Sequence, residues 1–489
     1  MEDCKMSNLS TGKASERIAG LLDAQSFVEI GSYVTARSTD FNLAEKETPA
    51  DGVITGYGTI DGNLVYVYSQ DASVLGGSMG EMHAKKISNV YALAMKMGAP
   101  VIGLVDCAGL RLQEGTDALQ AFGELYKNQT DASGVIPQIT AVFGTCGGGM
   151  GVVPALTDFT FMEKDNAKLF VNAPNALDGN IVSKCDTASA AYQSETIGSV
   201  DVAASEAEIF EEIRTLISVL PANNEDDMSF DECTDDLNRV CDGLENCAGD
   251  TSIALSMISD DNFFFETKRA YAKEMVTGFI RLNGNTVGAV ANRSEVCDEE
   301  GNVTETFDGV LTSAGCRKAA EFVEFCDAFN IPVLTLTNVK GYKANMHQER
   351  KIAKAVAEMT YAFANATVPK VNVIVGSAFG SAYVAMNSKS IGADVVFAWP
   401  NASIGMMDAK SAVKIIYADE IEKAENGAVL VNEKAKEYAE LQARALSAAR
   451  RGYVDNIIDA QDTRKYVIGA FEMLFTKREE RPAKKHGTV

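Results

Sequence analysis

The 489-residue sequence has little positive charge, few histidines and no long apolar run. Lysine and arginine number 44 against 68 aspartates and glutamates, which gives a formal charge of −24 at pH 7. A chain with this charge repels phosphate backbones and anionic lipid headgroups. We therefore expect no nucleic-acid partner, and the charge favours solubility.

The sequence also shows no segment typical of membrane insertion or secretion. No apolar stretch approaches the roughly 18 to 20 residues that a membrane-spanning helix needs. The opening MEDCKMSNLSTGKASERI lacks the apolar region of a secretory signal peptide. Both observations predict a cytoplasmic protein.

Metal-binding spacings are absent as well. The ten cysteines form no C-x-x-C pair, and the only histidines are His83, His347 and His486. Structural zinc sites need four such ligands at short spacings. The closest grouping, Cys233, Cys241 and Cys247, lies in an acidic stretch that we expect to be exposed. No metal site is predicted.

The sequence does contain a long internal repeat. Residues 51–70 (DGVITGYGTIDGNLVYVYSQ) are echoed by 273–292 (KEMVTGFIRLNGNTVGAVAN), with Asp61-Gly62 opposite Asn283-Gly284. Each copy predicts two alternating strands joined by a tight hairpin turn. The chain is also too long for one ordinary core. Two domains of one fold follow from the repeat.

Two further pairs of segments match at a constant offset of 232 positions. They are KKISNVYALAMKMGAPVIGLVD (85–106) with 317–338, and IPQITAVFGTCGGGMG (136–151) with VPKVNVIVGSAFGSAY (368–383). The pattern of short strands and amphipathic helices predicts an α/β fold of repeated strand-strand-helix units. Acidic and polar residues mark 221–250 as a linker, so the predicted domains are 1–220 and 251–489.

Each copy contains a strand that runs into a turn of small residues, TCGGGMG (145–151) and SAFGSAY (377–383). Free amides at the start of a helical turn can bind an anion, so the two turns are candidate oxyanion holes. Small residues could equally serve close packing of helix on sheet. Neither turn has the spacing of a P-loop or of a dinucleotide fingerprint, which disfavours nucleotide hydrolysis.

Two short motifs suggest other chemistry. GGSMG (76–80) fits the G-x-S-x-G nucleophile elbow, but its Ser78 would need His347 or His486 as a base, and a turn or helix cap is the better interpretation. Ala94-Met95-Lys96-Met97 has the lettering of a biotin attachment site. Biotin carriers present that lysine on an exposed hairpin.

The surroundings of Lys96 predict a helix in place of a hairpin. Apolar side chains recur at helical spacing on one face of 85–97, namely Ile87, Val90, Tyr91, Ala94 and Met97. Gly98 then ends the helix, and Asn330 stands at the same place in the second copy, where the four-residue lettering is not kept. We expect Lys96 to be a solvated helix residue without biotin.

Taken in order, several stretches resemble the carboxyltransferase subunit of biotin-dependent acyl-CoA carboxylases and decarboxylases over nearly the whole chain. They are SERIAGLLDAQSFVEI (15–30), DGVITGYGTIDG (51–62), VLGGSMGEMHAKKI (74–87), GAPVIGLVDCAGLRLQEG (98–115), SGVIPQITAVFGTCGGGMG (133–151), ATVPKVNVIVG (366–376), GADVVFAWPNASIGMM (392–407) and the tail KREERPAKKHGTV.

This resemblance implies two tandem crotonase-like domains and a homo-oligomer, usually a hexamer, with active sites between an N-terminal domain of one subunit and a C-terminal domain of another. It implies a coenzyme A thioester on the N-terminal side and biotin, brought by a separate biotin carboxyl carrier protein, on the C-terminal side. Further partners would be a biotin carboxylase or membrane decarboxylase subunits. The carboxyl group would move between biotin and a short acyl-CoA, either propionyl-CoA/methylmalonyl-CoA or acetyl-CoA/malonyl-CoA.

Roles for individual residues also follow from the resemblance. The amides of Gly148 and Gly149 would hold the thioester enolate, and those of Ser381 and Ala382 would hold the biotin ureido oxygen. Substrate-binding positions would be Gly76, Gly77, Gly109, Gly147 and Gly380, with Val384 at a position associated with acyl-chain choice. Main-chain N–H groups provide such donors without titrating.

The sequence departs from the family pattern at three places. Gly380-Ser381-Ala382-Tyr383 replaces Gly-Gly-Ala-Tyr, DCAGLR (106–111) replaces Asp-Ser-Gly-Gly-Ala-Arg, and 341–359 replaces a loop rich in glycine and proline and is one residue shorter. These changes bear on the substrate more than on the reaction class.

Other functions stay open at this point. The chain could be the alpha subunit of a sodium-pumping acyl-CoA decarboxylase, with the pump in other chains. It could be a crotonase-like hydratase or hydrolase of CoA thioesters, which would need an acid and a base beside Gly148. It could also be a scaffold that holds a carrier protein, if the changed turn at 380–383 and the loop 341–359 close the biotin pocket.

Overall fold

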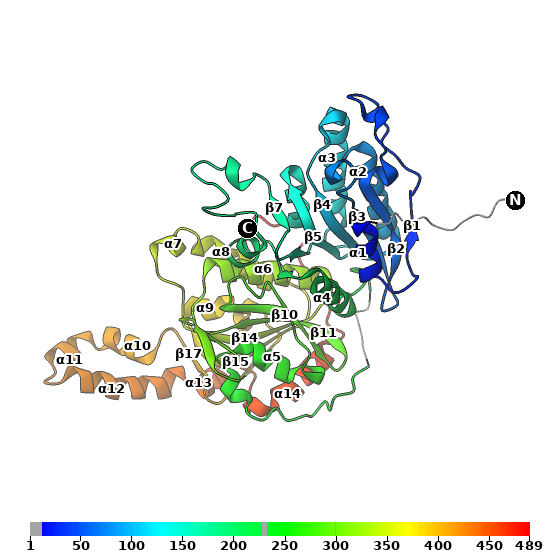
Figure 1. Ribbon diagram of the computed structural model, residues 1–489. Coiled ribbons are helices and arrows are strands. Elements are labelled where there is room, and N and C mark those ends of the chain that lie inside the picture. Colours follow the sequence, from blue (N-terminus) through cyan, green and yellow to red (C-terminus); the bar gives the residue numbers. More distant parts are fainter. Residues whose placement is uncertain (1–11, 227–231, 299) are drawn as a thin grey trace. The chain divides into compact units, whose positions relative to one another are not determined.

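A computed structural model describes residues 12–226, 232–298 and 300–489. The chain divides into two compact units, Met1–Ser229 and Phe230–Val489, each built on its own mixed β-sheet (Figure 1). The division falls inside the segment 221–250, while the three limits 1–220, 221–250 and 251–489 stay a prediction.

The N-terminal sheet has the order β1-β2-β3-β4-β5-β6-β8, and β7 pairs with the far end of β5. The outer pairs β1/β2 and β2/β3 are antiparallel, and the pairs from β3 onwards are parallel. Its strands are β1 (Val28–Glu29), β2 (Val53–Ile60), β3 (Asn63–Gln70), β4 (Val101–Cys107), β5 (Gln138–Gly147), β6 (Phe159–Glu163), β7 (Lys168–Phe170) and β8 (Val202–Ala204).

The C-terminal sheet repeats this arrangement strand by strand, in the order β9-β10-β11-β14-β15-β16-β18 with β17 on β15. A separate hairpin, β12 (Glu295–Cys297) with β13 (Val303–Thr306), is inserted after β11. The sheet strands are β9 (Phe265–Thr267), β10 (Met275–Leu282), β11 (Asn285–Asn292), β14 (Val333–Val339), β15 (Lys370–Phe379), β16 (Val395–Ala398), β17 (Ser403–Gly405) and β18 (Asn456–Ile457). Two similar α/β units are therefore confirmed.

The two predicted hairpin turns are confirmed. Ile60 pairs with Asn63 and Leu282 pairs with Asn285, so each loop has two residues. All four turn residues have positive φ, namely Asp61 (48°), Gly62 (84°), Asn283 (52°) and Gly284 (76°). Aspartate, asparagine and glycine tolerate that conformation, which matches the right-handed twist of the strands.

Helices cover the sheets, and the longest ones pack in pairs, α2 with α3 and α6 with α8. The N-terminal helices are α1 (Lys13–Leu21), α2 (Glu81–Met97), α3 (Gly115–Ala132) and α4 (Glu206–Val219). The C-terminal helices are α5 (Thr251–Ile258), α6 (Ser313–Ala328), α7 (Met346–Glu349), α8 (Ile352–Asn365), α9 (Gly380–Ala385), α10 (Ala409–Ile416), α11 (Ala418–Lys423), α12 (Gly427–Tyr438), α13 (Ala445–Arg450) and α14 (Thr463–Leu474).

The helix predicted around Lys96 is α2. Its residues Ile87, Val90, Tyr91 and Ala94 lie in the core of the N-terminal unit beside residues of β4 and α3. Met97 was expected on the same buried face, but its side chain is 60% exposed. It is the last residue of α2, and the chain turns away at Gly98 directly after it.

The predicted helix ends are confirmed in both copies. Gly98 has φ 61° and Asn330 has φ 58°, the left-handed conformation that these two residue types tolerate. The residue after each cap donates its N–H back to the helix, from Ala99 to the Ala94 carbonyl and from Ile331 to the Cys326 carbonyl. The strand that follows starts at the same relative position in each copy.

The cysteine-containing part of 221–250 is not wholly exposed as expected. Cys241 is 2% exposed and its thiol donates to the carbonyl of Met257, 3.3 Å away. Leu244 is equally buried, and both belong to the core of the C-terminal unit. Single apolar residues of this acidic stretch therefore pack into the core, and the overall polarity of the stretch did not indicate this.

Candidate active site

The two glycine turns occupy equivalent places in the two sheets. β5 ends at Gly147 and a 3₁₀ helix, Gly148–Val152, follows, while β15 ends at Phe379 and α9 follows. Gly148 has φ 62° and Gly380 has φ 63°. In each unit the first amides of a helical turn therefore stand at the carboxyl end of a central parallel strand, where anions bind.

A side chain from the neighbouring strand supports each turn. The Asp106 carboxylate, at the end of β4, accepts the N–H of Thr145 (3.2 Å), and the Asn338 amide oxygen, in β14, accepts the N–H of Ser377 (2.9 Å). The two hydrogen bonds occupy equivalent places in the two units. They fix the backbone three residues before Gly148 and Gly380.

The structure brings the predicted N-terminal glycines together from three loops. The N–H of Ala108 bonds to the carbonyl of Gly76, and a methyl group on Gly109 would lie 3.3 Å from the carbonyl oxygen of Gly147. Gly77 lies directly against the backbone of Asp106. The loops after β3, β4 and β5 thus meet at one edge of the sheet, beside Gly148.

Tyr126, which the sequence did not single out, contacts the N-terminal turn. Its hydroxyl, from α3, donates to the carbonyl oxygen of Gly149 (2.5 Å). Because a peptide group is planar, this bond turns the N–H of Met150 to the opposite side. Partial burial raises the pKa of the phenol, so it stays protonated and can keep donating.

The C-terminal turn carries side chains that the N-terminal one lacks. Ser381 is exposed, Ala382 is buried and Val384 is 38% exposed. The hydroxyl of Tyr342, from the loop after β14, donates to the hydroxyl oxygen of Ser381 (3.0 Å). Two of the departures from the family pattern therefore touch one another.

A buried ionic cluster lies beneath the N-terminal loops. Arg111 is fully buried with Asp51 and Glu114, and its guanidinium bonds to both carboxylates and to the carbonyl of Ser78. Removing one member of such a cluster leaves a buried charge without its partner, which is strongly destabilising. The cluster therefore ties the loop at 74–80 to the loop at 107–115.

His83 lies next to that cluster. Its ring Nδ1–H donates to the carbonyl of Asp51 (2.9 Å), and its Nε2 accepts from the Gln70 amide (3.1 Å). Burial, and after it the charge of Arg111, lowers the pKa of His83 to about 3. A neutral, fully bonded imidazole holds structure and does not transfer protons at neutral pH.

Ser78 is bound in the same way. Its hydroxyl donates to the carbonyl of Leu75 (2.7 Å) and lies 3.4 Å from Nε of Arg111. The hydroxyl closes a turn, as the alternative interpretation of GGSMG predicted. Among the described residues no group of three His, Cys, Asp or Glu side chains is placed to hold a metal ion.

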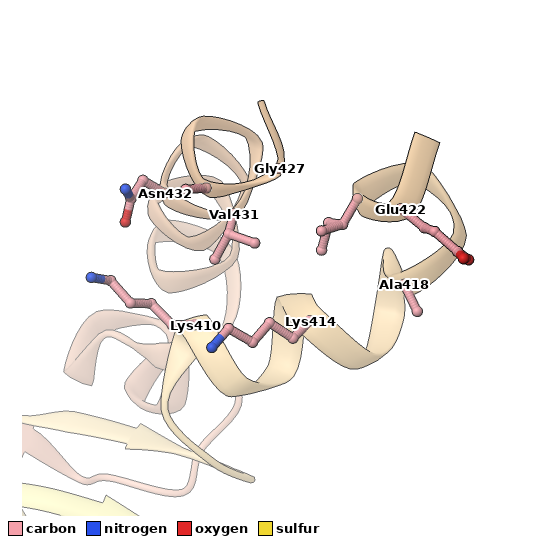
Figure 2. Close-up of a pocket in the computed structure, with 9 residues that line it drawn as sticks. Lys410, Lys414, Ala418, Glu422, Gly427, Val431 and Asn432 are labelled. Carbon is pink, nitrogen blue, oxygen red and sulfur yellow. The ribbon is translucent and has the colours of Figure 1, made fainter. Parts of the chain in front are cut away.

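A hollow of about 650 Å³ lies elsewhere in the C-terminal unit, between α10, α11 and α12 (Figure 2). Figure 1 shows these helices as an arm that extends from the sheet. The hollow is lined by Lys410, Lys414, Ala418, Ile421, Glu422, Gly427, Ala428, Val431 and Asn432. None of the predicted site residues lines it.

Known proteins resemble this chain along its whole length. The model of the carboxyl transferase domain matches residues 9–489. The carboxyltransferase subunit of propionyl-CoA carboxylase from Haloferax mediterranei is 41% identical over 502 residues, covering 100% of this chain and 95% of that protein. Methylmalonyl-CoA decarboxylase subunit alpha from Propionigenium modestum is 40% identical over 488 residues, with coverages of 97% and 92%. The chain belongs to the carboxyl transferase family.

A solved structure of this family has the same fold. The transcarboxylase 12S hexamer with hydrolysed methylmalonyl-coenzyme A bound superposes with a TM-score of 0.91 at 37% identity, over 97% of this chain and 92% of that one. The expected pair of crotonase-like domains is thus confirmed. The expectation that the chain is an enzyme of the biotin-dependent acyl-CoA carboxyltransferase family is confirmed as well. In the described part of this family member, no helix is long and apolar enough to cross a membrane.

Proposed function

We propose that the chain moves a carboxyl group between biotin, attached to a separate carrier protein, and a short acyl-CoA, with propionyl-CoA and methylmalonyl-CoA as the preferred pair over acetyl-CoA and malonyl-CoA. The observation that carries the proposal is the matched pair of glycine turns, at Gly148 and Gly380, in a chain of the carboxyl transferase family. Relatives named for propionyl-CoA and methylmalonyl-CoA support the choice of substrate.

In the carboxylating direction the N1–carboxylate bond of carboxybiotin, a substrate of this chain, breaks and releases carbon dioxide. The electron pair stays on the ureido group, which then removes the α-proton of the acyl thioester. The resulting enolate attacks carbon dioxide, forming the new C–C bond. The products are biotin, protonated at N1, and the carboxylated thioester, so atoms and charge balance.

The protein's share in this scheme is to hold two anions. Gly148 and Gly149 would direct their N–H groups at the thioester enolate, and Ser381 and Ala382 would direct theirs at the ureido oxygen. Fixed donors of this kind each contribute about 3 to 4 kcal/mol of transition-state stabilisation. No side-chain base is required, because the substrate removes the proton itself.

The same chemistry in reverse would serve a decarboxylase. The Propionigenium modestum relative is the alpha subunit of such an enzyme. In that case the carboxyl group would pass from methylmalonyl-CoA to biotin, and further subunits would release it. The hexamer of the transcarboxylase relative supports a homo-oligomer here too. A biotin carboxyl carrier protein is the partner that this proposal requires.

A hydratase or hydrolase is a weaker candidate. It needs an acid and a base beside the N-terminal turn. Asp106 and Tyr126 each bond to a backbone group of that turn. These contacts give both side chains a structural role there, which disfavours them as the acid and the base.

The test is a transfer assay with the purified chain. Free biotin and methylmalonyl-CoA are incubated with it, and the loss of the acid thioester and the gain of propionyl-CoA are followed by chromatography, with malonyl-CoA in parallel. We expect loss that depends on biotin and is faster with methylmalonyl-CoA. Absence of turnover with either thioester would refute the proposal, and turnover without biotin would favour a hydrolase.

A further inference from the structure

The hydrogen bond between Tyr342 and Ser381 joins two segments that are distant in sequence. Tyr342 follows β14 and Ser381 is the second residue of α9. The tyrosine is half-buried and the serine exposed, with 3.0 Å between their hydroxyl oxygens. A ligand arriving at the C-terminal turn can therefore reach the serine hydroxyl.

The N-terminal unit provides an internal comparison. The bridge between Met79 and Leu110 corresponds to the bridge between Leu311 and Tyr342, so Leu110 stands where the C-terminal unit has Tyr342. Gly149 stands where it has Ser381, at the same 232-position offset. The repeat unit does not need either hydroxyl to fold, and the C-terminal unit has both.

The direction of the bond decides which proton is available. Tyr342 donates its hydrogen to the oxygen of Ser381. A serine hydroxyl has one donor and two acceptor sites, so its own hydrogen remains for another partner. Accepting a bond from the phenol also polarises the serine O–H and strengthens what it donates.

The serine side chain also points the right way. In a helix every Cα–Cβ bond is tilted towards the N-terminal end, which is where the first N–H groups point. The Ser381 hydroxyl thus lies on the same side as the amides of Ser381 and Ala382. A ligand oxygen bonded to those amides would lie within reach of the hydroxyl.

We propose that Ser381 is a further catalytic residue, whose hydroxyl donates a third hydrogen bond to the ureido oxygen of biotin, with Tyr342 as its positioning residue. This inference rests on the proposed function and names a side chain for the same site. It would make the C-terminal turn a stronger anion site than its N-terminal counterpart, which has backbone donors alone.

Three single substitutions test it, in the intact chain with free biotin and methylmalonyl-CoA. Ser381→Ala removes the hydroxyl and keeps the amide, Ser381→Thr keeps both, and Tyr342→Phe removes the polarising donor. We expect Ser381→Ala to lower kcat by about 10²-fold, the effect of losing one oxyanion donor, with the KM for the acyl-CoA unchanged. Tyr342→Phe should cause a smaller fall, and Ser381→Thr should retain most of the activity.

The double variant Ser381→Ala/Tyr342→Phe separates positioning from general damage. If Tyr342 acts through Ser381, the double variant should be no slower than Ser381→Ala. Tyr453→Phe is the matched control, because Tyr453 is 58% exposed and lies outside the turn. Thermal unfolding of each variant reports whether the fold is kept.

The outcomes are distinct. A kcat unchanged or raised in Ser381→Ala would overturn the inference, and a rise would mean that the hydroxyl obstructs the site. Additive losses in the double variant would overturn the role of Tyr342. Biotin binding is measured in parallel by saturation-transfer NMR, and a wild-type chain that neither binds biotin nor transfers a carboxyl group would overturn this inference and the proposed function together.

Discussion

The carboxylate of Asp106 fills the space that a side chain on Gly144 would need. A Cβ atom built on Gly144 would lie 2.1 Å from Oδ1 of Asp106. The second copy has the same relationship, because a Cβ on Gly376 would lie 2.5 Å from the amide oxygen of Asn338. These two glycines leave room for the side chains that support the turns, and they are not part of the proposed anion sites.

Gly144→Ala should therefore destabilise the N-terminal unit. The added methyl group has to displace Asp106, whose bond to Thr145 would be lost. Overpacking of this kind costs about 1 to 3 kcal/mol. The measurement is the shift of the urea unfolding midpoint, followed by circular dichroism.

Gly123→Ala is the matched control for that substitution. Gly123 lies inside α3, and a Cβ atom there would meet nothing within 4 Å. Alanine should raise stability there by about 0.5 to 1 kcal/mol, since glycine is the poorer helix former. Equal effects of the two substitutions would contradict the role given to Asp106.

Gly148→Ala should reduce activity far more than stability. Gly148 has φ 62° and a Cβ atom would meet nothing within 4 Å, so the cost is backbone strain of about 1 to 2 kcal/mol. Relief of that strain would swing the amides of Gly148 and Gly149 out of line. We expect carboxyl transfer, measured by thioester loss, to fall by about 10²-fold.

The control for strain alone is Gly62→Ala. Gly62 has φ 84° with open space around it. It lies in the β2–β3 hairpin, at the start of β3, whereas the loop of the candidate site follows the other end of β3, at Gln70. The two variants should be destabilised alike, but Gly62→Ala should keep its activity. A comparable loss of activity in both would mean that strain, and not the position of the amides, is responsible.

Local sequence determined the parts of the fold that could be predicted. The hairpin turns needed residues that tolerate positive φ, and the helix ends needed Gly98 and Asn330. The internal repeat predicted two similar domains, each with its own sheet. These features depend on neighbours within a few positions. The glycines of three loops could be placed in one site only through the resemblance to a family.

Contacts between distant segments were not predictable. Tyr126 reaches Gly149 across 23 positions and Arg111 reaches Asp51 across 60, and neither residue type is unusual where it stands. For the pair Tyr342 and Ser381 a signal existed, because both lie in departures from the family pattern. One sequence cannot show that two departures touch.

The histidine at 83 should make the chain sensitive to acid. Burial holds its pKa at about 3 in the folded chain, against 6.5 as the ordinary value. Between those values the unfolded chain binds the extra proton, so the free energy of unfolding falls as the pH drops below 6.5. The slope for one proton is at most about 1.4 kcal/mol per pH unit.

His83→Gln removes that titration and keeps groups that can donate and accept. The free energy of unfolding of both proteins is measured from pH 7.5 to 4.5. We expect the wild type to be the more stable at pH 7.5 and to lose its advantage steadily below pH 6.5. Parallel curves for the two proteins would show that His83 does not contribute to acid unfolding.

Lys96 should carry no biotin, although the four residues 94–97 have the sequence of a biotin attachment site. It lies in the last turn of α2, a helix whose opposite face is in the core and whose end is fixed by Gly98. A biotin carrier offers its lysine on a hairpin, and forming one here would expose Val90, Tyr91 and Ala94, at a cost of several kcal/mol. Purified from cells with active biotin ligase, the chain should give a negative streptavidin blot and an unmodified mass, while a carrier protein from the same cells is positive.

A biotinylated Lys96 would mean that α2 unfolds readily, and the carrier role proposed for another polypeptide would then have to be given to this chain.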